Sequence, residues 1–317
     1  MKINSKTLKW CIQIAGTVVL LYFTIKKVDK ANLVNVLNNL SIMPLLFVPF
    51  ILIVDLLINS ARIKSLYSLY YVDTKVKDIF MIRLQGLFFS LAVPYLGDAF
   101  TVYNCKSLYG EGYQKHTIVI FLDRLIFTLG LILLVAPVWL FSIIAVSWLY
   151  KVGVLILLLI NLVLIHAVNN SSLLKAINSI SQAIFKKHAV PDSMHRSNKE
   201  YYVSIFSNTA VAVLRHSLIA VLYVIIAYAL VHSFHFDVVG FILVVFSIML
   251  SRVIPASVGG IGLREYLAVM ILPQVGISED FAFSIAFFIS LIVVIQGVIG
   301  GIVFMFRKLV TRDFKMC

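Results

Sequence analysis

Charged residues are scarce in this chain. They make up 13% of its 317 residues, against about a quarter in soluble domains. Hydrophobic residues reach 61%, and they stand in long runs instead of being spread evenly. This composition excludes a soluble enzyme, because a folded domain could not hide so much apolar surface from water. We expect an integral membrane protein in which residues 1–317 form a single membrane domain.

The chain also lacks the signatures of common hydrolytic and metal sites. Neither an HExxH nor a GxSxG motif occurs. The seven histidines are scattered, and the three cysteines share no metal-binding or redox spacing. His232 and His235 precede Asp237, but a solvated turn explains this group more simply than a metal ion. We therefore expect no metal, no cofactor and no catalytic residue.

Positive charge is in excess. The chain has 27 lysines and arginines against 14 acidic residues, a formal net charge of +13. These cations are dispersed between apolar runs and form no separate basic module, so nucleic acid is not an expected partner. In a membrane protein, such an excess gathers in cytoplasmic loops and sets the orientation. Cations concentrate between Arg62 and Arg83, between Asn169 and Tyr202, and after Arg307, which predicts that these segments and both termini are cytoplasmic.

A membrane-spanning helix needs about 20 mainly apolar residues. Six runs in this chain meet that requirement, so the predicted fold class is all-α, a polytopic helical bundle of about six full spans. The six runs are Trp10–Val28, Ile42–Ala61, Thr117–Ser147, Val152–Val168, Val203–Val231 and Phe281–Phe306.

Two further apolar stretches are interrupted by helix-breaking residues. Leu84–Tyr103 is broken at Pro94 and Gly97, and Val238–Val275 is broken at Pro255 and the glycines that follow it. Each stretch predicts a re-entrant hairpin of two short helices. The charge distribution requires the first hairpin to enter from the cytoplasm and the second from outside.

The resulting order is span, span, hairpin, span, repeated once. Each half has an odd number of spans, so the second half is inverted relative to the first. This agrees with an inverted repeat of halves 1–149 and 150–317, a plan found in many transporters, although no residue-level repeat is visible. Between spans, the apolar residues of Ile63–Phe80 follow helical spacing. They fit either a helix on the inner leaflet or a connector packed on the bundle.

Several charged residues fall within the apolar stretches, where a charge is costly and is a functional-site candidate. Mutual pairing of four acids with four bases is the structural alternative. Arg215 is too deep to reach the interface easily, so we expect it to face the bundle interior. The eight residues are Asp55, Asp98, Asp123, Arg124, Arg215, Arg252, Arg264 and Glu265.

The segment Ile254–Glu265 carries the most specific pattern. Pro255 ends one helix, and the glycines allow a turn with exposed N–H groups before a new helix begins. Free N–H groups at a helix start suit a phosphate. Arg264 can add charge-assisted hydrogen bonds to the same phosphate, and Glu265 can orient Arg252 or Arg264. The pattern predicts a phosphate site, with an ion pair of Arg264 and Glu265 or Asp98 as the alternative.

At these residues the chain resembles the transmembrane domain of the lysylphosphatidylglycerol synthase family of flippase-like membrane proteins. The resemblance covers nearly the whole chain. It consists of an early Pro-x-x-Gly-acidic motif, an acidic-Arg-Leu motif, a late Pro-x-Ser-x-Gly-Gly-x-Gly-x-x-Glu motif, and an arginine after the second span. The matching residues are Pro94, Gly97 and Asp98; Asp123, Arg124 and Leu125; Pro255, Ser257, Gly259, Gly260, Gly262 and Glu265; and Arg62.

The chain departs from the family in two places. Many members have an arginine soon after the early motif and another in the last span. Here Asp98 leads into Ala99–Tyr103, and Phe281–Phe306 has Gln296 as its most polar residue. Full synthases of the family carry a soluble transferase domain after the membrane part, and the sequence ends at Cys317 without one. The resemblance therefore implies lipid translocation without aminoacyl transfer.

These observations predict the translocation of an anionic lipid across a prokaryotic cytoplasmic membrane. The expected substrate is a phospholipid or a polyprenyl-phosphate-linked lipid. The expected partners are membrane lipids, and a homo-oligomer or an envelope-biosynthesis partner is compatible with the sequence. The alternative is a membrane-embedded glycosyltransferase, or an accessory protein in envelope glycolipid or polysaccharide assembly. The predicted substrate-binding residues are Arg62, Pro94, Gly97, Asp98, Asp123, Arg124, Arg215, Arg252, Pro255, Ser257, Gly259, Gly260, Gly262, Arg264 and Glu265.

Overall fold

All regular elements in the described residues are helices. The predicted first span, Trp10–Val28, falls almost wholly outside these residues. The computed structural model describes residues 22, 24, 38, 40–92, 95–140, 148–169, 197–231, 237–252 and 260–313.

Five of the described helices are long and apolar enough to cross a membrane. They correspond one to one with the other five predicted spans, which confirms an all-α polytopic bundle. The first of the five is made by α3 and α4 together. The helices are α3 (Ile42–Leu45), α4 (Val48–Leu69), α7 (Tyr113–Leu140), α8 (Trp148–Asn169), α10 (Asn198–Val231) and α13 (Glu279–Asp313).

The first broken stretch forms two packed helices, α5 (Val76–Ala92) and α6 (Leu96–Tyr109). Glycine lets their backbones meet: a Cβ at Gly97 would lie 2.2 Å from the Gly86 carbonyl oxygen. The helix pair is therefore present, and it begins earlier than the apolar pattern indicates. Pro94 lies outside the described residues, and entry of this pair from the cytoplasm stays a prediction.

The second broken stretch forms α11 (Val238–Met249), the 3-10 helix η1 (Leu250–Arg252), α12 (Leu263–Ile271) and the 3-10 helix η3 (Leu272–Val275). Asp237 caps α11, because its carboxylate accepts a hydrogen bond of 3.0 Å from the Val239 N–H. Pro255, Ser257 and Gly259 lie in residues 253–259, outside the described ranges.

The segment Ile63–Phe80 is a packed connector and not one surface helix. Helix α4 continues to Leu69, and α5 begins only at Val76. Ile63 and Tyr67 are fully buried. The helical spacing therefore reflects burial against the bundle on both sides of a turn.

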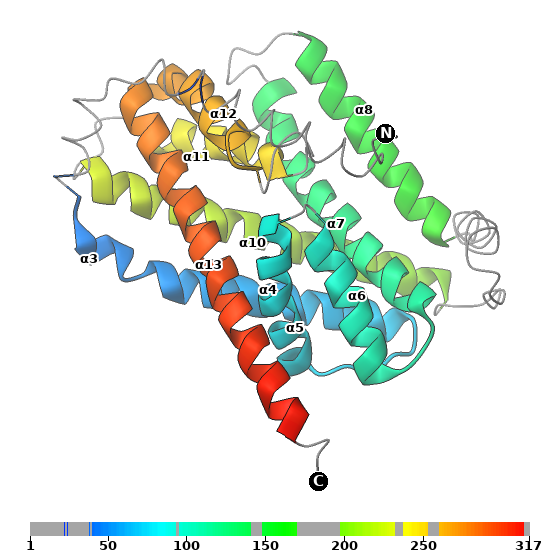
Figure 1. Cartoon of the computed structure of the whole chain (residues 1–317). Coiled ribbons are helices and arrows are strands. Elements are labelled where there is room, and N and C mark those ends of the chain that lie inside the picture. Colours follow the sequence, from blue (N-terminus) through cyan, green and yellow to red (C-terminus); the bar gives the residue numbers. More distant parts are fainter. Residues whose placement is uncertain are drawn as a thin grey trace, which may run out of the picture.

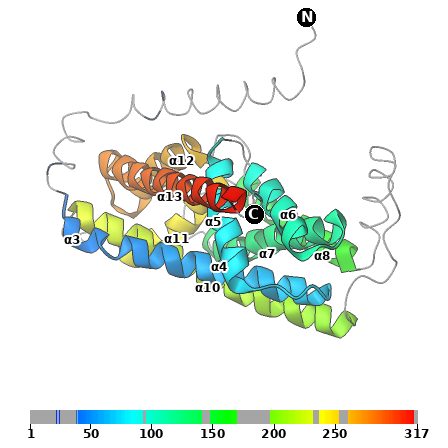
Figure 2. The same cartoon turned by 60° about the horizontal axis from the view of Figure 1, so that its bottom comes forward.

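Helices α4 and α10 lie side by side in opposite directions (Figures 1 and 2). The Ser41 N–H at the start of α3 donates to the Ala229 carbonyl near the end of α10, at 2.9 Å. At the other end, the Asn208 amide donates to the Ser65 hydroxyl at 3.1 Å. Helix α7 also packs on α10, and α13 packs along α5 (Figure 1).

The buried side chains form two apolar clusters. The first contains Ile51 of α4 and Ile219 of α10, together with α11, α12 and the beginning of α13. The second contains Ile63 of α4 and Ala212 of α10, together with residues of α5, α7 and α8. On both α4 and α10, the residues between the two clusters include charged side chains. The fold thus places charge between two apolar layers.

Candidate functional site

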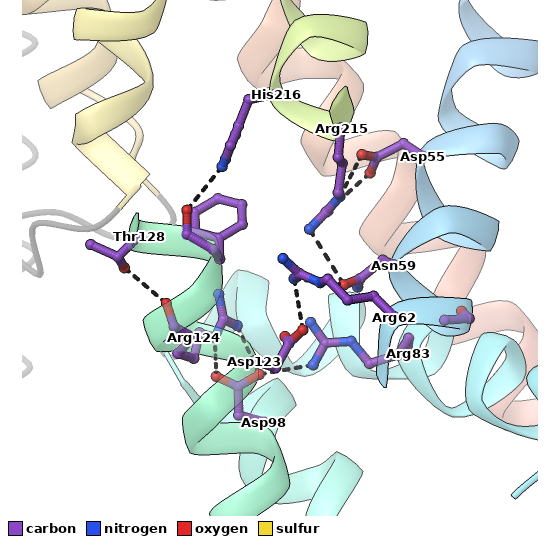
Figure 3. A network of polar contacts seen from close by, with 12 residues as sticks. Asp55, Asn59, Arg62, Arg83, Asp98, Asp123, Arg124, Thr128, Arg215 and His216 are labelled. Atoms are coloured by element: carbon purple, nitrogen blue, oxygen red, sulfur yellow. Dashed lines mark hydrogen bonds and ion pairs between the residues drawn. The ribbon is translucent and has the colours of Figure 1, made fainter. Parts of the chain in front are cut away.

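A group of charged side chains from five helices meets between the two clusters (Figure 3). We call this group the arginine array. It contains four arginines, three aspartates and one asparagine, and its aspartates come from α4, α6 and α7. The array consists of Asp55, Asn59, Arg62, Arg83, Asp98, Asp123, Arg124 and Arg215.

Arg215 joins α10 to α4. Its Nε and Nη2 donate to the two carboxylate oxygens of Asp55 at 2.6 and 3.0 Å. Its side chain is 14% exposed, which confirms that Arg215 faces the interior. The Nε2 atom of the next residue, His216, lies 2.9 Å from the Phe127 carbonyl oxygen of α7. This contact links α10 to α7.

Arg62 lies at the centre of the array and is fully buried, with 0% side-chain exposure. Its Nη2 donates to Asp123 at 2.7 Å and to Asn59 at 3.2 Å. The same Asn59 oxygen accepts from Arg215 Nη1 at 3.4 Å, so the asparagine connects the two ion pairs. Arg62 Nε and Nη1 are buried and have no hydrogen-bond partner among the described residues. A buried arginine normally uses its donors, so the remaining ones call for an acceptor.

Asp98 holds two arginines in the first turn of α6. Arg124 Nε and Nη2 donate to its two oxygens at 2.7 Å each, and Arg83 Nη1 donates at 2.9 Å. Asp123 and Arg124, adjacent on α7, therefore point to different partners, as neighbours on a helix must. The sequence interpretation used Arg83 only as an orientation marker and missed its place in the array. The sequence feature that could have indicated this role is that Arg83 directly precedes the predicted hairpin Leu84–Tyr103, which contains Asp98.

The array has one more arginine than aspartate. Arginine stays protonated at any physiological pH and has no acceptor, so the group carries a surplus positive charge. Its planar guanidinium groups suit the tetrahedral oxygens of a phosphate, which accept several charge-assisted hydrogen bonds. Within the described ranges, no three His, Cys, Asp or Glu side chains gather as a metal site would require. The arrangement can bind and hold an anion.

A second buried arginine lies at the start of α12, in a group that we call the closed α12 site: Gly262, Arg264, Glu265 and Ser290. Gly262 has a φ of +86°, which favours glycine. Its N–H donates to Glu265 Oε2 at 2.5 Å. Arg264 Nη1 donates to the Ser290 hydroxyl at 2.8 Å, and that hydroxyl donates to Glu265 Oε1.

The helix start that the sequence predicts as a phosphate site is thus occupied by its own glutamate. Arg264 and Glu265 are each 1% exposed, and Ser290 of α13 links them. Gly260 lies beside them: a Cβ there would be 3.1 Å from Arg264 Nη2. Arg252 ends η1, and its side chain lies outside the described part of the structure. Gly97 lies in the contact between α5 and α6. The other predicted residues that the structure describes either belong to the array or lie at the start of α12.

The fold and the buried array define a multi-pass helical membrane protein. Residues 10–301 match the model of the family described as the lysylphosphatidylglycerol synthase TM region. The chain belongs to that family, a membrane family linked to lipid and envelope biosynthesis or lipid flipping. No curated protein and no solved structure matches the chain.

Proposed function

We propose that this protein translocates an anionic lipid, either a phospholipid or a polyprenyl-phosphate-linked lipid, across a prokaryotic cytoplasmic membrane. The observation that carries the proposal is the buried Arg62, which keeps two nitrogens without a partner among the described residues inside a group with a surplus arginine. A phosphate supplies both the missing acceptors and the missing negative charge. Membrane-family membership makes a lipid phosphate the natural source.

The aspartates have a definite role in this mechanism. A charged arginine is costly at bilayer depth, so Asp55, Asp98 and Asp123 hold the arginines while no lipid is present. An arriving phosphate then binds the donors that the aspartates leave free, Arg62 Nε and Nη1, so that no carboxylate is left buried without a partner. The closed α12 site would accept a phosphate only if Glu265 withdrew, and the proposed route does not pass through it.

The proposal includes a topology. Both termini are cytoplasmic, the α5–α6 pair enters from inside, and the Gly259–Gly262 tip enters from outside, within inverted halves. Cysteine labelling on intact cells tests this arrangement, with single cysteines placed in a background lacking the three native ones. Residues Asn169–Lys199 should stay unlabelled by an impermeant reagent until the cells are opened. Strong labelling of this segment from outside would contradict the topology.

The test of function uses proteoliposomes containing fluorescent phosphatidylglycerol, with dithionite reporting the lipid exposed outside. Wild-type protein should expose the inner-leaflet pool, and empty liposomes should not. Arg62→Lys keeps the charge that balances Asp123 but loses the planar fork. We expect about tenfold slower translocation, corresponding to roughly 1.4 kcal/mol, with little loss of folded protein.

The matched control is Lys64→Arg, an exchange between the same residue types at an exposed position of α4. It should translocate at the wild-type rate. Translocation by Arg62→Lys at the wild-type rate would remove the central observation from the proposal. A wild-type protein that exposes no more phosphatidylglycerol than empty liposomes, and no more of a fluorescent polyprenyl phosphate in the same assay, would contradict the function itself.

A further inference from the structure

An apolar groove of about 590 Å³ runs between α4, α5 and α13. This volume falls within the range of about 300–1,000 Å³ that is usual for small-molecule sites. Leu52 of α4, Leu84 of α5 and Ile292 of α13 represent its three walls, and Gln296 is the one polar side chain among its described lining residues. A ligand that fits this lining is a hydrocarbon.

One end of the groove meets the arginine array. On α4, Leu52, Leu56 and Asn59 follow one another at spacings of four and three, so they share one face of the helix. Leu52 and Leu56 line the groove, and Asn59 binds both Arg62 and Arg215. On α5 the lining residue Leu84 directly follows Arg83. The groove and the arginine array are therefore neighbours along α4 and α5.

The length of the groove matches one leaflet. The lining runs from Leu45 of α3 to Leu56 of α4, and from Phe288 to Ile299 on α13. Each stretch rises about 16 Å at about 1.5 Å per residue. Half of a hydrocarbon core that is about 30 Å thick is nearly the same length. An acyl chain of ordinary length fills one leaflet, whereas a polyprenyl chain is much longer.

The walls of the groove are held apart by independent contacts. Helix α13 lies directly on α5, since a Cβ at Gly300 would be 2.1 Å from the Leu84 carbonyl oxygen. Helix α4 also contacts α5, and Asp55 and Arg215 hold it to α10. The three walls are therefore positioned by contacts within the protein, and the groove does not depend on a ligand.

We infer that this groove binds one acyl chain of an anionic glycerophospholipid whose phosphate contacts the arginine array. The inference rests on the proposed function and names the substrate class: a glycerophospholipid rather than a polyprenyl-linked lipid. The phosphate lies at the Asn59 and Arg62 end, and the chain extends toward Leu45. The surplus positive charge selects the headgroup, and the groove length selects the tail.

The test uses the full chain in nanodiscs with a phosphatidylglycerol that carries a diazirine at the end of one acyl chain. After illumination, peptide mass spectrometry locates the crosslinks. Because the probe is at the end of the chain, we expect them around Leu45 and Phe288, at the end of the groove away from the array. Leu52→Trp should lower crosslinking and translocation about tenfold by filling the groove.

The control is Leu57→Trp, on the same helix at a side chain that is 44% exposed and does not line the groove. It should match the wild type. If Leu52→Trp does not fold, Ile292→Trp makes the same test on α13. Its control is Val298→Trp, at an exposed residue that does not line the groove.

The outcomes separate this inference from the proposed function. Wild-type translocation by the groove variants, together with loss in Arg62→Lys, would overturn the acyl-chain site and leave the function standing. Groove crosslinks without any translocation by the wild type would support the site and contradict the function. Displacement of the probe by a polyprenyl phosphate, but not by unlabelled phosphatidylglycerol, would overturn the choice of glycerophospholipid.

Discussion

Two fully buried arginines of this protein, Arg62 and Arg264, lie in opposite electrostatic surroundings. Arg62 belongs to a group with more arginines than aspartates, and two of its nitrogens have no partner among the described residues. Arg264 stands next to a glutamate that also occupies the N–H of a helix start. Both arginines are among the substrate-binding residues predicted from the sequence.

The difference shows what makes an anion site. A glycine turn before a helix exposes N–H groups, but a glutamate three residues later accepts from the Gly262 N–H, as the glutamate of a capping box does. The glycine pattern therefore builds a closed helix start. In the array, carboxylates are fewer than arginines, and two Arg62 nitrogens keep no hydrogen-bond acceptor among the described residues. The balance of charges around an arginine, and not its motif, distinguishes a site ready for an anion from one already filled.

The largest expected effect comes from removing the charge of Arg62. Arg62→Gln leaves Asp123 buried without its partner, which typically costs about 3–5 kcal/mol. The double variant Arg62→Gln/Asp123→Asn removes both charges and should recover most of that stability, measured by thermal unfolding in detergent. Translocation should stay lost in the double variant. Recovery of translocation along with stability would mean that Arg62 serves only to balance Asp123.

A smaller effect is expected when the closed α12 site is opened. Glu265→Gln keeps the shape of the side chain but removes the negative charge that occupies the Gly262 N–H and faces Ser290. We expect a loss of about 1–3 kcal/mol, the usual result of leaving a buried donor poorly satisfied. Inorganic phosphate should then raise the melting temperature of the variant more than that of the wild type, since a ligand stabilises the form it binds.

Asp55→Asn serves as the comparison for that experiment. It also removes one buried carboxylate beside an arginine, but it does so on α4, in the array. An equal response of Glu265→Gln and wild type to phosphate would show that the glutamate does not occupy an anion position. In that case the contrast between the two arginines would lose its physical basis.

Most of the fold was predictable because apolar length and helix-breaking residues are local signals. The run Val203–Val231 became α10 with its end unchanged, and the break at Pro94 lies between α5 and α6. The spacing of Ile63–Phe80 was ambiguous, because a face buried in the bundle and a face buried in lipid have the same period.

The pairing inside the site could not be predicted from one sequence. Arg62 and Asp123 are 61 positions apart, and Arg215 and Asp55 are 160 apart, so no local pattern connects them. Arg83 was missed because it follows a lysine-bearing segment that is typical of a cytoplasmic loop. The closure of the α12 helix start depends on Ser290 of another helix, which the motif does not contain.

The smallest effect that sharpens the comparison concerns Ser290. Its hydroxyl accepts from Arg264 and donates to Glu265, so Ser290→Ala removes the link between the two charges while leaving both in place. The net contribution of a hydrogen bond is about 1 kcal/mol, and we expect a loss of that size in thermal unfolding. Ser284→Ala is the matched control on α13, because the Ser284 hydroxyl donates within its own helix, to the Asp280 carbonyl at 2.8 Å, and to no other helix among the described residues. Translocation should change little in either variant, since the array lies elsewhere. If Ser290→Ala slowed translocation as much as Arg62→Lys, the closed α12 site would belong to the substrate route, and the distinction between the two arginines would have to be abandoned.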